Sequence, residues 1–306
     1  MVKLNPGDKI CIVGGGTTGL YVLKACLEHN LIPTVFEAAD SVGGVWRSKG
    51  PGGLAYDSLH TNSSSLLTCA SDFPFSPTST KTWHPAAFEI CEHLEKYCDH
   101  YNLRKYIKFG YRVEKVIHQP LSNYYDEHSE YDDEKNEMWN VQVMSSKHHN
   151  NNNNNIVEKY TFDAVFICSG QYGTHVNMPT FKNSNIFKGK IIHSQTYRSP
   201  SEGDDKNVVI LGMGNSSLDI AFDMAERSNA KEILHCARNG SFMTAVGSGN
   251  ESIPPGDVTF HSKLINVYIL YILYILPLYN YTNNTHTHTF IYIYMYSCKY
   301  VISNHI

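Results

Sequence analysis

The sequence contains no pair of cysteines at C-x-x-C spacing, although it has eight cysteines among its 306 residues. Cysteines scattered in this way indicate reduced thiols and argue against a disulfide framework or a zinc site. Cys11 and Cys168 lie inside apolar runs, where a free cysteine usually acts as a small hydrophobic residue. The missing pair also argues against a disulfide reductase, which needs a redox-active dithiol.

A long basic run and an N-terminal leader are missing too. The formal net charge is −4, which predicts no nucleic-acid-binding surface. The first residues, MVKLNPGDKICIV, enter an apolar run at once, so we expect no signal or transit peptide. The expected absence of a leader and the reduced thiols together predict a cytoplasmic protein, and we expect no bound metal ion. The length allows two domains of ordinary size, while nothing indicates the oligomeric state.

Residues 264–306 lack aspartate, glutamate, alanine and glycine, and Lys299 is their only formally charged side chain. The apolar part, 264–279, is short for a membrane span of about 20 residues and is interrupted by Asn266 and Pro277, which argues against membrane association. The strings THTHT and IYIYMY are what alternating dinucleotide repeats encode, and YILYILYIL can come from a repeated nine-base unit of A and T. We interpret the tail as translated non-coding sequence, not a domain; a membrane anchor and a divergent domain remain alternatives.

What the sequence does contain is a glycine-rich loop between a strand and a helix. The string GGGTTG fits G-x-G-x-x-G at Gly14, Gly16 and Gly19, after the apolar run Lys9 to Val13. Such glycines permit a tight turn, close approach to a pyrophosphate, and helix–strand packing. Glu37 ends the next predicted strand at the distance expected for an acid that binds a ribose. Together these features predict a dinucleotide site, and its pairing with the second loop, described next, suggests FAD.

A second loop of this kind follows the apolar run Asn207 to Leu211. Its string GMGNSS contains Gly212, Gly214, Asn215 and Ser216, with Ser217 where a third glycine would stand, and a small residue there still permits helix packing. The next strand ends at Arg238 rather than at an acid. An arginine suits the 2′-phosphate of NADPH, so the second loop predicts NADPH, which would pass electrons to the flavin.

Apolar periodicity and the two glycine loops predict an α/β fold with two dinucleotide-binding, Rossmann-like domains and a small antiparallel β-flap in the first. The predicted domains are 1–172 for FAD, with loop insertions near 122–137 and 147–156, and 173–263 for NADPH. The flap strands are Tyr111 to Ile117 and Met138 to Met144, and Asp163 to Cys168 is a buried strand. We predict helices at Thr18 to His29 and from Pro85 onward, the latter with the apolar face Phe88, Cys91, Leu94, Tyr97 and Cys98.

Between the loops, Phe187, Gly189, His193 and Tyr197 form the string F-x-G-x-x-x-H-x-x-x-Y. This resembles the fingerprint of flavin-containing monooxygenases, which stands just before their NADPH loop. The similar string of Baeyer–Villiger monooxygenases typically ends in tryptophan, so Tyr197 favours the first group. The resemblance implies that His193 and Tyr197 organise the connection between cofactor domains and are not a catalytic dyad.

Further motifs of that family appear in order over residues 6 to 260. The string SVGGVWR resembles a flavin-side segment and implies that Gly44, Val45 and Trp46 lie near the cofactor. Thr61 and Asn62 match a Thr-Asn pair, followed by a D-F-P-F string at Asp72 to Phe75. By resemblance, Asn62 is the catalytic residue that faces the flavin ring and acts after flavin reduction, and Val113 contacts the adenine end through its backbone.

The resemblance implies an NADPH- and O2-dependent flavin monooxygenase that oxygenates a small molecule with a soft nitrogen or sulfur nucleophile. Chains of this family continue beyond the length seen here and return to the flavin domain, so the resemblance implies that the second dinucleotide-binding domain is incomplete. In one interpretation, this chain alone is therefore only part of such a monooxygenase, or an inactive form of it. A non-catalytic nucleotide-binding remnant is the alternative, and another FAD/NADPH oxidoreductase such as a Baeyer–Villiger enzyme is the third candidate.

Overall fold

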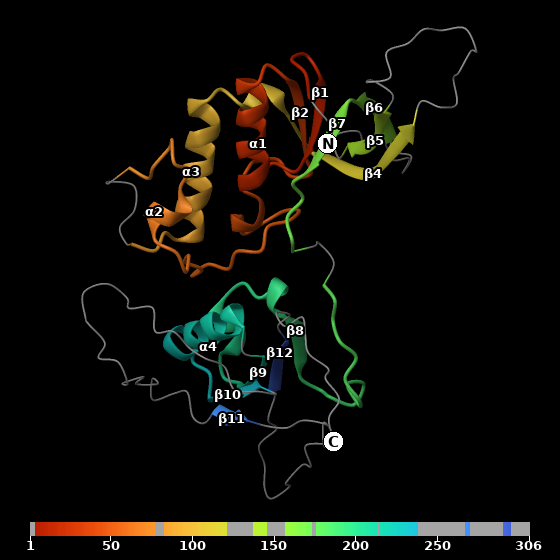
Figure 1. Ribbon diagram of the computed structural model, residues 1–306. Helices are drawn as coiled ribbons and strands as arrows, with labels where there is room; N and C mark the ends of the chain where they lie inside the picture. The colour runs from red at the N-terminus through yellow and green to blue at the C-terminus, as the bar shows by residue number, and fades with distance from the viewer. Residues whose placement is uncertain are drawn as a thin grey trace, which may run out of the picture. The chain divides into compact units, whose positions relative to one another are not determined.

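The computed structural model describes residues 4–76, 83–120, 137–145, 157–172, 176–212, 214–237, 267–269 and 290–294. The chain divides into two compact units (Figure 1). The first consists of Met1–Ala55, Ser65–Lys81 and Pro85–Thr174, and the second of Tyr56–Ser64, Thr82–His84 and His175–Ile306. The chain thus leaves the first unit close to the predicted boundary at 172. Residues 56–64 and 82–84, which the sequence prediction places in the first domain, cluster with the second unit, and Tyr56 packs in its core.

The first unit is built on a parallel sheet of four strands in the order β3-β2-β1-β7. Its strands are β1 (Lys9–Val13), β2 (Ile32–Glu37), β3 (Ile107–Phe109) and β7 (Ala164–Ile167). Val13 pairs with Phe36, so β1 and β2 end side by side at the carboxyl edge of the sheet. Ligands of open parallel sheets bind beyond this edge.

Two helices cover one face of this sheet (Figure 1). They are α1 (Thr17–Glu28) and α3 (Ala87–His100), and a short helix, α2 (Ser65–Thr68), precedes α3. Both long helices are followed by an asparagine with positive φ, Asn30 at 56° and Asn102 at 53°. Asparagine tolerates this left-handed conformation, which lets the chain turn out of a helix. The core on this face combines Ile10, Ile12, Leu20, Leu23, Val35, Ile90, Leu94 and Tyr97.

The predicted second helix begins at Ala87, two residues after Pro85, and Glu89 accepts a hydrogen bond from the backbone N–H of Ala86. The apolar face predicted for this helix is wrong in one position. Phe88 is 62% exposed. The buried stripe runs instead through Ala87, Ile90, His93, Leu94, Tyr97 and Cys98, and Phe73 and Phe75 pack against His93 on this helix.

The opposite face of the parallel sheet packs on a small antiparallel sheet, as expected for the β-flap. Its strands are β4 (Tyr111–Pro120), β5 (Glu137–Ser145) and β6 (Val157–Phe162), in that order. Cys11 and Phe36 point to this side and pack with Val141, Val143 and Phe162. The predicted insertions at 122–137 and 147–156 lie almost entirely outside the described residues. The prediction that the strand now labelled β7 is buried is wrong: it is an edge strand of the described sheet, and Ile167 is 64% exposed.

The second unit has a parallel sheet in the order β11-β10-β9-β12-β8. Its elements are β8 (Lys190–His193), β9 (Asn207–Leu211), α4 (Asn215–Arg227), β10 (Glu232–Ala237), β11 (Val267–Ile269) and β12 (Phe290–Tyr294). Val208, Ile210 and Ile233 pack against Ile220 and Met224 of α4. Two segments of the tail, β11 and β12, pair in this sheet, with β12 between β8 and β9. That residues 264–306 form no domain of their own stays a prediction.

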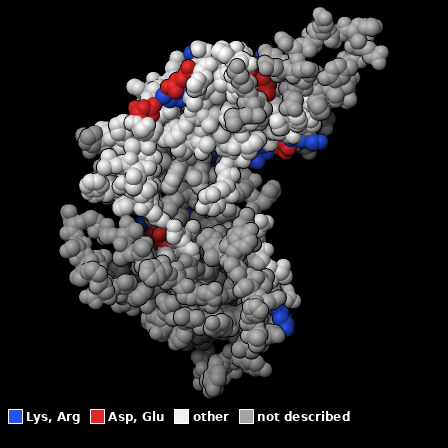
Figure 2. Space-filling view, in the orientation of Figure 1, with Lys and Arg blue, Asp and Glu red and all other residues white. Residues whose placement is uncertain are grey.

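Charged side chains of opposite sign lie close together on the surface of the first unit. Arg104 pairs with Glu95 and Asp99, and Lys24 pairs with Glu28 and Asp72. On the face shown in Figure 2, the described acidic and basic side chains form small neighbouring groups. Within the part of the chain that the structure describes, no helix is both long and apolar enough to cross a bilayer.

Candidate functional site

The first glycine loop joins β1 to α1, and two of its glycines are required by the fold itself. Gly14 has a φ of +104°, and a β-carbon there would lie 2.6 Å from the carbonyl oxygen of Cys168. At Gly19, a β-carbon would lie only 1.9 Å from the carbonyl oxygen of Gly14. Side chains at these positions would collide with backbone atoms that have nowhere to move. Both glycines therefore bring helix and strand together, as the sequence predicts.

Gly16 is different, because the protein leaves room for a β-carbon at this position. The nearest atom to such a carbon would be the Cα of Gly44, at 3.5 Å, which is an ordinary contact. Gly16 has extended backbone and is the N-cap of α1, whose first turn contains no acidic residue. A helix N-terminus carries backbone N–H donors and partial positive charge, which suit a phosphate. The absence of a side chain at Gly16 thus keeps space open in front of the N-terminus of α1.

Glu37 supports this loop from the end of β2. Its Oε2 accepts a hydrogen bond of 2.5 Å from the backbone N–H of Gly15, and its Oε1 accepts one of 2.8 Å from Ala39. The side chain is only 6% exposed. The structure shows Glu37 supporting the glycine loop, and the ribose ligand expected from the sequence stays a prediction. Each carboxylate oxygen can accept a further bond, so the two roles are compatible.

The other residues implied near the flavin lie in different settings in the first unit. Gly44 to Trp46 form a short 3₁₀ turn, and Gly44 has a φ of +56° next to Gly16. Val45 is exposed, while Trp46 packs against the core beneath α1 and α3. Val113 lies in β4 beside a register shift and packs against the core between the two sheets. The structure brings Gly44 to the glycine loop, and a contact between the Val113 backbone and adenine stays a prediction.

The second glycine loop repeats the geometry of the first. Gly212 has a φ of +119°, and Gly214 is the N-cap of α4, which also has no acidic residue in its first turn. Ser217 is fully buried, and its hydroxyl donates a 2.8 Å hydrogen bond to the carbonyl oxygen of Gly214. A serine therefore fills the third glycine position without opening the helix packing. Asn215 and Ser216 are exposed at the helix start, and Arg238 lies outside the described residues.

His235 of β10 holds the turn of the second loop. Its Nε2 lies 2.5 Å from the carbonyl oxygen of Gly212, so the neutral ring donates its Nε2 proton to that oxygen. Burial lowers the pKa of His235, with the hydrogen bond to Gly212 acting in the opposite direction. No sequence pattern indicates this role, because His235 lies within a strand and reaches the loop only through the pairing of β10 with β9.

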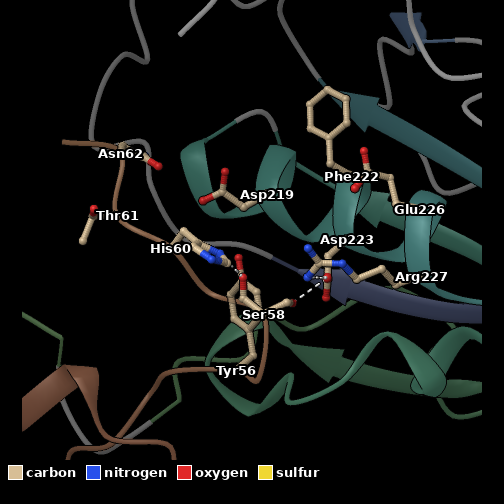
Figure 3. A pocket seen from close by; sticks show the side chains of 10 residues that line it. All are labelled: Tyr56, Ser58, His60, Thr61, Asn62, Asp219, Phe222, Asp223, Glu226 and Arg227. Carbon is tan, nitrogen blue, oxygen red and sulfur yellow. Dashed lines mark hydrogen bonds and ion pairs between the residues drawn. The ribbon is translucent and has the colours of Figure 1, made fainter. Parts of the chain in front are cut away.

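Thr61 and Asn62 lie in the second unit, on one wall of a pocket of about 190 Å³ (Figure 3). Thr61 is buried and donates a 2.7 Å hydrogen bond to the carbonyl oxygen of Ser63, whereas Asn62 is exposed. The other wall is α4, which contributes Asp219, Phe222, Asp223, Glu226 and Arg227. Burial raises the pKa of Asp219 to about 6.

The fingerprint residues His193 and Tyr197 flank a short 3₁₀ turn before the second loop. The Nδ1 of His193 accepts a 3.2 Å hydrogen bond from the backbone N–H of Gln195, and burial lowers the pKa of this histidine. Tyr197 is fully buried, and its hydroxyl donates a 2.6 Å hydrogen bond to Oδ2 of Asp223. Burial and then this bond raise the pKa of Tyr197. Sequence reasoning missed Asp223, the partner that explains the tyrosine.

A parallel strand that passes through a glycine loop into the N-terminus of a helix is typical of dinucleotide-binding proteins. This chain contains the arrangement twice, as two-cofactor oxidoreductases do. A family model described as "Flavin-binding monooxygenase-like" matches residues 7–284. The chain therefore belongs to the flavin-binding monooxygenase-like family.

Curated relatives agree with this family. The chain is 30% identical over 261 residues to dimethylaniline monooxygenase [N-oxide-forming] 2 of Cavia porcellus, covering 83% of this chain and 44% of the relative. It is 32% identical over 247 residues to flavin-containing monooxygenase 3 of Homo sapiens, covering 78% and 41%. The chain thus spans less than half the length of these relatives.

Solved structures share the mixed α/β fold. S-allyl-L-cysteine S-oxygenase from Allium sativum aligns with a TM-score of 0.63 at 20% identity, covering 94% of this chain and 62% of that one. Cyclohexanone monooxygenase from Rhodococcus sp. Phi1, bound to NADP+, aligns with a TM-score of 0.55 at 22% identity, covering 80% and 40%. At these identities the likeness concerns the fold alone.

Proposed function

We propose that this chain is the cofactor-binding part of a monooxygenase that uses FAD, NADPH and O2 to oxygenate a small molecule at a soft nitrogen or sulfur atom. The observation that carries the proposal is the pair of strand–glycine–helix loops, one of which is supported by Glu37. Family membership points the same way. The relatives are an N-oxide-forming enzyme and a flavin-containing monooxygenase, and one structural neighbour is an S-oxygenase.

The first loop fits FAD and the second fits NADPH. Gly16 leaves open space at a helix N-terminus without a competing acid, which suits the pyrophosphate. Glu37 retains acceptor capacity for the hydroxyls of the adenosine ribose. Gly214 presents the N-terminus of α4 in the same manner for the second dinucleotide. The bound cofactors would supply hydride transfer from NADPH to FAD and the activation of oxygen.

The role proposed for Asn62 is to orient oxygen chemistry at the flavin and to exclude water from it. The side chain is exposed in the second unit and carries both an amide donor and an amide acceptor. A neutral amide can hold a reacting group by hydrogen bonds without itself taking up a proton. No nucleophile or acid–base pair is required for oxygen transfer to a soft nucleophile.

We expect Asn62→Ala to act after flavin reduction. In a preparation that holds FAD, the rate of flavin reduction by NADPH should stay within about twofold, because the role proposed for Asn62 begins only after the flavin is reduced. The fraction of NADPH consumed that ends as hydrogen peroxide should rise severalfold, since one positioning hydrogen bond is worth about 1 kcal/mol. Stopped-flow reduction and a peroxide assay measure the two quantities. His60→Gln, a substitution in the same pocket, is the control and should change neither quantity. Slow flavin reduction with an unchanged fraction of hydrogen peroxide in Asn62→Ala would contradict the assignment.

We expect Arg238→Ala to lower the affinity for NADPH and to leave NADH almost unaffected. Only NADPH carries the 2′-phosphate, and a charge-assisted bond to it is worth about 1.5–3 kcal/mol, or roughly 10- to 150-fold in affinity. Titration of the chain with both nucleotides tests this. Lys231→Ala removes an exposed cation just before the same strand and should change neither affinity. Equal losses for both nucleotides in Arg238→Ala would show that the arginine serves only the fold.

A further inference from the structure

Residues Tyr56–Ser64, here called the strap, interrupt the first unit in the sequence but belong to the second unit in space. At its start, Tyr56 is buried in the second core and meets the ring of Tyr197 edge-on, with ring centroids 5.2 Å apart. The backbone N–H of Asp57 donates a 3.1 Å hydrogen bond to the carbonyl oxygen of Arg198. The strap therefore docks on the segment that contains the fingerprint tyrosine.

The carboxylate of Asp223 joins the strap, the fingerprint segment and helix α4. Figure 3 shows its contacts with Ser58 and Arg227. Asp223 of α4 accepts a 2.5 Å hydrogen bond from Ser58 Oγ on Oδ1 and a 2.6 Å bond from Tyr197 on Oδ2. Arg227, one turn further along α4, pairs with Oδ1 at 3.2 Å. Three donors from three segments thus converge on two oxygen atoms.

Because the Asp223 carboxylate is buried, it depends on the hydrogen-bond donors that surround it. Asp223 is 7% exposed, and a buried charge is tolerated only where donors and an opposite charge surround it. If the strap lifted away, the carboxylate would lose the Ser58 donor while Tyr197 and Arg227 remained. The docked position of the strap is therefore favoured over a displaced one by a charge-assisted hydrogen bond, and Tyr56 anchors its beginning.

We propose that Asp223 is a positioning residue that fastens the strap, and with it Asn62, to helix α4. Asn62 follows Ser58 by four residues, and both line the same pocket as Asp223. Helix α4 begins at Gly214 of the second glycine loop. Asn62 is thereby held by the unit that contains the second loop, although the segments on either side of the strap, Met1–Ala55 and Ser65–Lys81, belong to the first unit. The consequence for oxygenation rests on the role proposed for Asn62 above; the docking of the strap does not.

Hydrogen exchange on the 306-residue chain, without cofactors, tests the docking directly. The reporters are the amides of Asp57 and Leu59, which donate to the carbonyl oxygens of Arg198 and Tyr56. In Ser58→Ala, their exchange should accelerate about tenfold or more, because a bond to a charged acceptor is lost. Amides within α4 and β9 should keep their rates. Asp223→Asn should shift the same amides in the same direction.

The matched control is Asp219→Asn. Asp219 lies one turn earlier on α4 and lines the same pocket, and the structure shows no hydrogen bond from the strap to it among the described residues. Its substitution should leave the exchange of Asp57 and Leu59 unchanged. Unchanged exchange in Ser58→Ala would overturn the proposal. An equal acceleration throughout α4 and β9 would overturn it too, because these residues would then only stabilise the unit.

A second measurement separates this inference from the proposed function. In a preparation that holds FAD, Ser58→Ala should raise the share of NADPH lost as hydrogen peroxide, as Asn62→Ala does, without changing the KM for NADPH. Faster local exchange with unchanged peroxide would support the strap and count against the role given to Asn62.

Discussion

Replacing Gly16 by alanine is expected to leave the first unit folded while the affinity for FAD falls at least about tenfold, or about 1.4 kcal/mol. The added methyl group would lie 3.5 Å from the Cα of Gly44, so the apoprotein can accept it. At this N-cap the free energy of unfolding should change by about 1 kcal/mol or less. The same methyl group would occupy the space proposed for the pyrophosphate in front of α1. Thermal unfolding of the apoprotein and titration with FAD measure the two effects separately.

The contrasting variant is Gly19→Ala, in the same loop and with the same added methyl group. Its β-carbon would lie 1.9 Å from the carbonyl oxygen of Gly14, and that backbone atom is fixed by the turn. We expect a loss of about 3 kcal/mol in the free energy of unfolding, whether or not FAD is present. If Gly16→Ala bound FAD as tightly as the parent chain, the first loop would not be the pyrophosphate site.

The glycine loops could be predicted from the sequence because their chemistry is local. Each consists of consecutive residues between an apolar run and an amphipathic helix, and backbone sterics restrict which residues can occupy them. Glu37 was found for the same reason, since β2 follows α1 directly and pairs with β1. The family fingerprint likewise marked Tyr197 as important. It could not say what the hydroxyl of Tyr197 contacts.

The missed features depend on residues far apart in the sequence. Ser58 and Asp223 are 165 positions apart, and no pattern near either one indicates the other. Phe88 fits a helical apolar stripe by spacing, yet α3 turns a neighbouring stripe to the core and Phe88 is exposed. The β7 run looks buried by composition, but it pairs only with β1 within the described sheet. Where sequence periodicity does not distinguish between the faces of a helix or strand, tertiary packing decides which face is buried.

Glu37→Gln is expected to destabilise the first unit and to remove its preference for the ribose hydroxyls of FAD. The carboxylate accepts hydrogen bonds from Gly15 and Ala39 in a buried position. Glutamine keeps one acceptor oxygen, but its NH2 group would then face the backbone N–H of either Gly15 or Ala39. That N–H would lose its acceptor. The free energy of unfolding of the apoprotein should therefore fall by about 2 kcal/mol, the range of a hydrogen bond to a charged group. Asp40→Asn, with a side chain that is 98% exposed, should change it little.

Support of the loop alone would also weaken FAD binding, so a ligand comparison is needed to identify the ribose contact. The parent chain should bind FAD more tightly than an FAD analogue that lacks the 2′-hydroxyl of the adenosine ribose. The difference should be about tenfold, because the carboxylate would lose one charge-assisted bond. In Glu37→Gln the two ligands should bind with nearly equal affinity. If the variant kept the full preference for FAD, Glu37 would serve only Gly15 and Ala39, and another residue would have to contact the ribose.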